Sequence, residues 1–338
     1  MAELAADVGT PDQLLRQLEW TVIRRLDGLL QGDYRTLFRG TGLDLADLRE
    51  YQHGDDVRHI DWNVTARLQQ PHVRQFTEDR ELSAWFLLDL SGSVHFGSNE
   101  RTKLSVSEGF VAVLARLLTR HGNRVGAMLY RHRVEGVLPA RVGRNHVLQL
   151  LSAMRNSARA EAQEVRQRSR RGRRARDRHT VLADLLRHAD SMIPRRSMIF
   201  VLSDFISEPG WDDALGRLAR RHEVQAVRLY DPLEMQLPDV GLVTIEDAES
   251  GEQLFVDTQD PDFRARFAAL AEAHEAQLRA ALAKAQVDTL ELATDDDLLV
   301  SLLRFVALRR QRLRMHHGVH LPAALRHAAT PMPEALTP

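Results

Sequence analysis

The sequence predicts an α/β protein built on a parallel-type sheet with helices on both faces. Two short segments, residues 84–88 and 197–202, are apolar runs that lead into Asp89 and Asp204. Uninterrupted apolar runs of this length are typical of strands that are buried on both faces, as in parallel sheets. Other strand candidates alternate with segments in which apolar residues recur at helical spacing, and this alternation is the pattern of a helix-covered parallel sheet.

The expected elements follow in chain order. Residues 14–30 predict a helix that Gly32 could end, and residues 33–80 predict a mostly non-helical region wrapped on another part of the protein. The predicted strands lie at 84–88, 124–130, 134–138, 197–202, 224–229 and 287–292. The predicted helices lie at 103–120, at 145–155, at 180–189, from 211 onward, from the N-cap Asp260 to Lys284, and at 296–310.

One segment breaks the alternation. Residues 240–246 and 253–257 flank Ser250-Gly251 and predict a β-hairpin, inserted at about 231–260. We therefore divide the chain into an N-terminal helix with the irregular segment (1–81), a sheet domain (82–312) and a poorly ordered tail (313–338) that is rich in Pro, Ala and His.

Composition excludes several classes of site. The chain has 338 residues and no cysteine, so any metal must be held by oxygen or imidazole. The first residues lack a basic flank with an apolar core, and no apolar run approaches the ~20 residues that cross a bilayer, so we expect no signal peptide, no membrane span and a cytoplasmic location. The net charge of −1 favours neither nucleic acid nor membranes.

Oxygen donors follow the two buried strands. Ligands of open parallel sheets bind beyond the carboxyl ends of the strands, and the loop Asp89-Leu90-Ser91-Gly92-Ser93 can direct three oxygens at one centre, with Gly92 allowing a sharp turn. Asp204 reaches the same edge, and Thr180 could add a further donor. A donor set rich in hydroxyls and poor in carboxylates favours Mg²⁺ or Mn²⁺ over zinc.

Such an ion would stay electron-poor and would attract a carboxylate from outside, which is recognition without chemistry. A simpler interpretation is that these residues cap helices, since Asp, Ser and Thr are the preferred N-caps. Thr102 competes with Thr180 as the further donor.

Asp89, Ser91, Ser93, Thr180 and Asp204, in that order, resemble the metal-ion-dependent adhesion site of von Willebrand factor type A domains. The resemblance implies a Rossmann-like sheet of strand order 3-2-1-4-5-6. It also implies that the first four residues bind the ion directly or through water, while Asp204 contacts these ligands and not the ion itself.

Residues 48–62, followed by Ala66-Arg67, are similar to the signature of the bacterial family called domain of unknown function 58, which carries this segment just before a type A domain. The segment 231–252 is also similar, and the resemblance covers about 36–310. The signature residues that we single out, as structural or interaction residues, are Arg49, Glu50, Tyr51, Gly54, Asp55, Asp56, Arg58, Asp61, Trp62 and Arg67.

The charged members of the signature can form ion-pair networks beside a packed Trp62 and Tyr51, which would staple the N-terminal region onto the sheet. A catalytic carboxylate pair is the competing interpretation. Family resemblance further implies a partner, a MoxR-type AAA+ ATPase, and a role in assembling or activating protein complexes.

A basic segment precedes Thr180, with eight arginines between 166 and 178. Its density of charge predicts a solvated loop, whose residues Arg170, Arg171, Arg173 and Arg174 could bind an acidic partner. Nucleic-acid binding is a less favoured alternative because no aromatic side chains are interleaved for stacking.

The leading functional hypothesis is a non-enzymatic, metal-dependent protein-binding module. The alternatives are a magnesium-dependent phosphoester hydrolase and a nucleic-acid-binding protein. The sequence has no Gly-rich phosphate-binding loop and no recognisable nucleophile–base pair.

Overall fold

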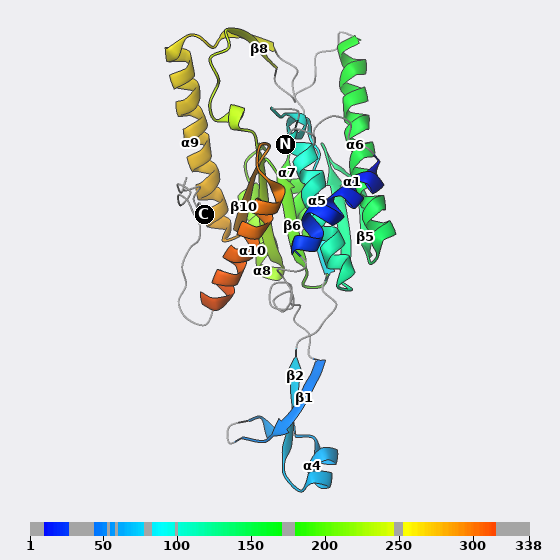
Figure 1. The fold of residues 1–338 in the computed structure, drawn as a ribbon. Helices are drawn as coiled ribbons and strands as arrows, with labels where there is room; N and C mark the ends of the chain where they lie inside the picture. Colours follow the sequence, from blue (N-terminus) through cyan, green and yellow to red (C-terminus); the bar gives the residue numbers. More distant parts are fainter. Residues whose placement is uncertain are drawn as a thin grey trace, which may run out of the picture.

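A six-stranded sheet with helices on both faces forms the centre of the protein (Figure 1). The computed structural model describes residues 10–26, 44–52, 55–57, 60–77, 83–98, 101–170, 180–246 and 253–315. The predicted class, mixed α/β with a mostly parallel sheet, is confirmed. The expected tail at 313–338 lies almost wholly outside the described residues.

The strands of this sheet agree closely with the apolar segments of the sequence. Its spatial order is β10-β7-β6-β3-β4-β5, which is 3-2-1-4-5-6 when the strands are numbered within the sheet. Only the edge strand β5 pairs in antiparallel fashion, with β4. The strands are β3 (Ser83–Asp89), β4 (Arg124–Tyr130), β5 (Val134–Arg141), β6 (Met198–Ser203), β7 (Glu223–Tyr230) and β10 (Asp288–Ala293).

Two hydrophobic layers sandwich the sheet, because successive side chains of a strand point to opposite faces. Phe86 and Leu88 of β3 pack into one layer and Leu87 into the other. The first layer is covered by α1 (Pro11–Leu18), the π-helical turn η1 (Glu19–Ile23), α5 (Lys103–Arg120), α6 (Arg144–Arg170) and α10 (Leu298–Met315). The second is covered by α7 (Leu182–Met192), α8 (Trp211–Arg221) and α9 (Pro261–Ala285).

The N-terminal helix belongs to the first layer. Leu15, Leu18, Val22 and Ile23 are buried there. Two ion pairs join it to neighbouring helices, Glu19 to Arg116 of α5 (Oε1–Nη2, 3.0 Å) and Asp12 to Arg144 of α6 (Oδ1–Nη2, 2.6 Å). The first described segment of the chain, residues 10–26, therefore lies with the main sheet.

The irregular segment forms a small unit of its own. Strands β1 (Asp44–Glu50) and β2 (His72–Thr77) pair antiparallel, and the short helix α4 (Trp62–Leu68) lies between them in the chain, with Asp61 as its N-cap. Figure 1 shows this unit, which we call the arm, projecting away from the main body. The expectation that residues 33–80 wrap onto the sheet is therefore wrong for the part that the structure describes.

Two helices differ from their expected lengths. The helix expected at 145–155 runs to Arg170, so the start of the arginine-rich segment is helical and the prediction of a loop is wrong there. Its buried apolar residues include Val147, Leu150, Leu151, Met154 and Ala158. In Figure 1 the last turns of α6 and the first turns of α9 extend past the carboxyl edge of the sheet, at the end opposite the arm.

The inserted hairpin is confirmed. Strands β8 (Leu242–Glu246) and β9 (Gln253–Asp257) pair antiparallel, after a 3₁₀ turn, η4 (Pro232–Glu234). Helix α9 begins as expected, with the Asp260 carboxylate accepting a hydrogen bond from the backbone N–H of Asp262 and with Pro261 at its first position. Within the described residues, no helix is long and apolar enough to cross a membrane.

Strand β4 carries a glycine that the core requires. A Cβ at Gly126 would come within 2.8 Å of the Trp85 ring on the adjacent strand β3. We expect Gly126→Ala to lower the free energy of unfolding by about 1–3 kcal/mol, as overpacking does, measured by urea denaturation. Gly136→Ala is the matched control, because its Cβ would meet only Leu129 at 3.6 Å. Equal stability of the two variants would contradict this account.

Candidate functional site

Polar side chains collect where the parallel strands end. Because β3, β6, β7 and β10 run in the same direction, their carboxyl ends meet along one edge of the sheet. Each strand ends in, or is followed at once by, a polar residue, and all of these are buried: Asp89, Ser203, Asp204, Asp231 and Thr294. The two apolar runs therefore deliver their aspartates to the predicted edge.

The loop after β3 brings the first three predicted donors together. The Asp89 Oδ1 atom accepts a hydrogen bond from the backbone N–H of Ser91 (3.0 Å), and the Ser91 and Ser93 hydroxyls share a hydrogen bond at 3.2 Å. The loop turns at once into a 3₁₀ turn, η3 (Gly92–His95), which puts Ser93 back beside Ser91. At most 8% of any of the three residues is exposed.

The electrostatics of Asp89 are unfavourable for its charged form. Burial, and next the negative charge of Asp204, raise the pKa of Asp89 to about 6, while hydrogen bonds from Ser203 and Ser91 act against the shift. Ser203 Oγ donates to Asp89 Oδ2 at 2.7 Å. The hydrogen-bond partners of Asp89 are thus neutral groups, and a positive charge beside it would stabilise the carboxylate.

Asp204 has a cationic partner instead. The ammonium group of Lys103, the first residue of α5, lies 2.8 Å from Asp204 Oδ2, and the other oxygen of Asp204 accepts a hydrogen bond from the backbone N–H of Ile206. Lys103 Nζ is also 2.6 Å from Glu234 Oε1 in η4. The Lys103 side chain is 0% exposed, so this ammonium is buried between two carboxylates.

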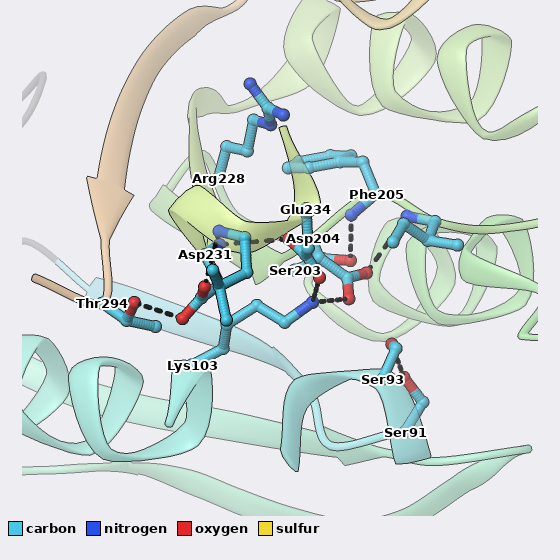
Figure 2. Close-up of polar contacts among 12 residues, drawn as sticks. Ser91, Ser93, Lys103, Ser203, Asp204, Phe205, Arg228, Asp231, Glu234 and Thr294 are labelled. Carbon is cyan, nitrogen blue, oxygen red and sulfur yellow. Dashed lines mark hydrogen bonds and ion pairs between the residues drawn. The ribbon is translucent and has the colours of Figure 1, made fainter. Parts of the chain in front are cut away.

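These two partners keep Lys103 charged. Burial would lower the pKa of Lys103, but the charges of Asp204 and Glu234 outweigh it and hold the pKa above its ordinary value. Figure 2 shows the ammonium group reaching Asp204, with Ser91 and Ser93 beside the pair. A permanent positive charge therefore stands next to the predicted metal site.

Asp231 closes the edge on the other side of Lys103. Its carboxylate accepts hydrogen bonds from the backbone N–H and hydroxyl of Ser98, from the hydroxyl of Thr294 and from the backbone N–H of Leu233. Glu234 Oε2 in turn accepts from the N–H of Asp231, so η4 is tied to the end of β7 (Figure 2).

Thr180 lies beside the loop that carries Asp204. It is buried, and its carbonyl oxygen accepts hydrogen bonds from Ser207 Oγ (2.8 Å) and from the Glu208 backbone N–H (2.9 Å). It does not cap α7, whose N-cap is Val181. These contacts do not join its hydroxyl to Asp89, and its role as a ligand stays a prediction.

The signature residues lie in the arm, far from this edge in Figure 1. Arg49 and Asp55 form a bidentate ion pair (2.8 and 2.7 Å), and Asp61 caps α4. Trp62 is 69% exposed, so the expectation of a packed Trp62 is wrong. Tyr51 is half-buried, its backbone N–H donating to Pro71, while Glu50, Asp56 and Arg67 are exposed.

Several predicted residues cannot be placed. Gly54 and Arg58 of the signature, and Arg171, Arg173 and Arg174 of the proposed partner-binding segment, lie outside the described residues. Arg170 is the last residue of α6.

Sequence reasoning missed Lys103 and Glu234. The sequence does hold a signal for the first: a lysine opening a helix opposes the positive N-terminal end of the helix dipole, so a special reason for it can be sought. Asp231 follows a strand just as Asp204 does, and the same rule could have found it. Nothing local in the sequence marks Glu234, because its partner lies 131 residues away.

The donors that converge here fit a hard divalent ion. Asp89, Ser91 and Ser93 offer one carboxylate and two hydroxyls, oxygen ligands of the kind that suit Mg²⁺ or Mn²⁺. The raised pKa of Asp89 marks a carboxylate without a charged hydrogen-bond partner. Across the described ranges, no three His, Cys, Asp or Glu side chains group as a metal site, so an ion here would depend on hydroxyl donors.

Comparison with known proteins identifies the family. The family described as "Protein of unknown function DUF58" matches residues 47–277. The chain belongs to the DUF58 family. The match begins in β1 and ends within α9, so both the arm and the candidate site are parts of the DUF58 region.

Relatives of this DUF58 protein include an uncharacterized protein of Mycobacterium tuberculosis and another of Mycobacterium bovis. Each is 38% identical over 310 residues, which are 91% of this chain and 93% of the relative.

Among solved structures, BatB from Bacteroides thetaiotaomicron matches 69% of this chain and 98% of its own, with 13% identity and a TM-score of 0.41. An aerotolerance-related membrane protein from Bacteroides fragilis matches the same shares, with 12% identity and a TM-score of 0.42. Similarity at this level carries no functional argument.

The Asp231 cluster gives a stability prediction. Burial would raise the pKa of Asp231, but its hydrogen bonds from Thr294, Leu233 and Ser98 hold the pKa below its ordinary value. We expect Asp231→Asn to lower the free energy of unfolding by about 1–3 kcal/mol at neutral pH, because an amide accepts with one oxygen only.

The depressed pKa also fixes the pH dependence. The contribution of the Asp231 charge is present above the unfolded pKa of about 3.9 and is lost as the pH falls through the lower folded value. Denaturation of the wild type and Asp231→Asn should therefore converge at acid pH. Asp295→Asn, an exposed neighbour, is the control; a gap between wild type and Asp231→Asn that stays constant down to pH ~2.5 would refute the explanation.

Proposed function

We propose that this protein is a divalent-metal-dependent protein-binding module of the von Willebrand factor type A class and that it does not catalyse a reaction. The observation that carries the proposal is the buried cluster of Asp89, Ser91 and Ser93 at the carboxyl edge of the sheet, where the one carboxylate has only neutral hydrogen-bond partners. Mg²⁺ or Mn²⁺ is the proposed ion.

The sheet topology supports the class. The strand order 3-2-1-4-5-6, with one antiparallel edge strand, is the order that the resemblance to type A domains implies. In such sheets, ligands lie beyond the carboxyl ends of the strands, beside the point where the strand order reverses. Here that point lies between β3 and β6, and those strands carry Asp89 and Asp204.

A metal site with a small number of negatively charged ligands is suited to the recognition of an anionic partner. An ion held by one carboxylate and two hydroxyls keeps most of its charge and binds a further anionic oxygen well. A glutamate or aspartate of a partner protein is the proposed occupant of that position. Asp204, which is paired with Lys103, would contact the groups that bind the ion and would not bind the ion itself.

The proposed partner is a MoxR-type AAA+ ATPase, with a role in assembling or activating protein complexes. Membership of the DUF58 family supports this choice by kinship alone. A cytoplasmic setting goes with the proposal, because an ATP-driven partner works where ATP is present. Protein is favoured over nucleic acid as the partner.

A double variant at the loop after β3 tests the proposal. We expect wild type to bind Mn²⁺ or Mg²⁺ in calorimetry, alone or with the ATPase present, and we expect Asp89→Ala/Ser91→Ala to lose binding by at least about a hundredfold, because two of three donors are gone. Retention of the ATPase on immobilised protein should require the ion and fail with the double variant.

The matched control is Asp213→Ala/Ser191→Ala, which makes the same chemical changes at exposed positions of α8 and α7. It should bind the ion and the ATPase as wild type does. Complex formation that persists in EDTA, or in the loop variant, would overturn metal-dependent recognition. Metal-dependent release of phosphate from generic esters would favour the hydrolase alternative instead.

A further inference from the structure

Lys103 is a buried lysine that lies beside the candidate site and pairs with both Asp204 and Glu234. We propose that Lys103 is a positioning residue that weakens metal binding by acting as the site's own counter-ion, so that a divalent ion is held firmly only together with a partner carboxylate. The inference rests on the proposed function and deepens it.

Geometry places Lys103 where a second cation would compete with it. Its ammonium lies 2.8 Å from Asp204 Oδ2, and Asp204 is close enough to Asp89 for its charge to act on that carboxyl. Helix α5 starts directly beside the metal loop, since the backbone N–H of Lys103 donates to Phe96 just after η3 (2.9 Å). The ammonium and a bound ion would therefore share one anionic neighbour.

Glu234 prevents the ammonium from moving aside. It lies 2.6 Å from Lys103 Nζ, and its other oxygen accepts from the backbone N–H of Asp231. Asp231 itself accepts hydrogen bonds from Ser98 and from Thr294 (Figure 2). The lysine is thus fixed on both sides, and its charge stays at the site whether or not an ion is bound.

A fixed positive charge has two effects on a nearby divalent ion. It repels the ion, and it cancels the attraction that Asp204 would supply. Both effects are strong because the groups are buried and little screened by salt. An ion that Asp204 does not neutralise retains more charge for an outside carboxylate, so metal and partner would bind cooperatively.

A purely structural role for Lys103 predicts the opposite result on mutation. Loss of a buried ion-pair partner leaves carboxylates uncompensated and destabilises the fold, and a disordered site binds metal less well. Our inference predicts a gain: Asp89, Asp204 and Glu234, released from the ammonium, would form a more negative site. Tighter metal binding by the variant would therefore support the inference, because destabilisation of the fold would weaken metal binding.

The experiment is a Mn²⁺ titration of the full-length protein, followed by electron paramagnetic resonance of free Mn²⁺ and by calorimetry. We expect Lys103→Met to bind Mn²⁺ at least about tenfold more tightly than wild type, because a unit charge a few ångströms away changes the energy of a divalent ion by more than this, even at an effective dielectric constant of about 20. Thermal unfolding of each variant with and without Mn²⁺ gives an independent measure of affinity.

A second variant covers the case in which Lys103→Met does not fold. Glu234 is 27% exposed in its side chain, so Glu234→Gln is the milder change. It removes an anion and leaves Lys103 paired with Asp204 alone, and we expect it to weaken Mn²⁺ binding several-fold. Lys284→Met is the matched control: Lys284 also bridges two carboxylates, Asp212 and Asp213, but at the exposed surface, and its loss should leave Mn²⁺ affinity unchanged.

The outcomes separate this inference from the proposed function. If wild type binds Mn²⁺ and folded Lys103→Met binds it no more tightly, the inference is wrong and the metal-dependent module stands. Unchanged or tighter binding by Glu234→Gln would also overturn it. If neither wild type nor Lys103→Met binds Mn²⁺, even with the ATPase present, there is no metal site and both proposals fail.

Discussion

Balance of charge at the carboxyl edge of the main sheet constrains this protein more than any other interaction. Asp89 and Asp204 end two adjacent strands that are buried on both faces, and water cannot solvate both charges there. One ammonium group, that of Lys103, partly balances these charges, and it forms an ion pair with Asp204 and not with Asp89. Asp89 is left with neutral hydrogen-bond donors and a raised pKa. The charge of Asp204 is thus neutralised by Lys103, whereas the charge of Asp89, which lies beside the hydroxyls of Ser91 and Ser93, is not.

The same bridge holds together elements that are distant in the sequence. Lys103 opens α5, Asp204 follows β6, and Glu234 lies in η4 after β7. Asp231 then connects η4 to Thr294 after β10 and to Ser98 before α5. Removal of any one member would take a hydrogen-bond or ion-pair partner from a buried polar group, and partly satisfied buried networks are destabilising. The inserted hairpin starts from this network, so its base is fixed to the sheet edge.

Much of the main sheet could be predicted because each of its strands is a local pattern. The runs that became β3 and β6 are apolar on both faces, and Pro261 after Asp260 marks the start of α9. The convergence of Asp89, Ser91 and Ser93 could be predicted for the same reason, since they lie within five residues. Glu234 could not, because its contact with Lys103 spans 131 residues of the chain, and Lys103 is marked only by its unusual place at the start of a helix.

The errors share a cause as well. The arginines near residue 170 predict a loop, yet the helix continues to Arg170, because arginine is a good helix former. The signature predicts ion-pair networks beside a packed Trp62, but a side chain packs only where a neighbour covers it, and Trp62 is exposed. In α4, none of the seven residues is buried. The sequence indicates which side chains are apolar enough to be buried, but tertiary contacts determine which of them are buried.

The position of the arm separates the signature segment from the candidate metal site. The arm, which carries the signature segment, lies at one end of the molecule, and the carboxyl edge of the sheet, where the candidate metal site lies, faces the other end (Figure 1). Residues such as Arg49, Asp55 and Asp61 are occupied in building the arm itself, through an ion pair and a helix cap. A role for them at the metal would require contacts across the whole sheet. The competing interpretation of the signature, a catalytic carboxylate pair within the segment itself, stays a prediction and does not involve Asp89 or Asp204. The arm presents an exposed Trp62 on α4, a helix in which no residue is buried. Any function of the signature is therefore separate from the charge balance at the opposite edge of the sheet.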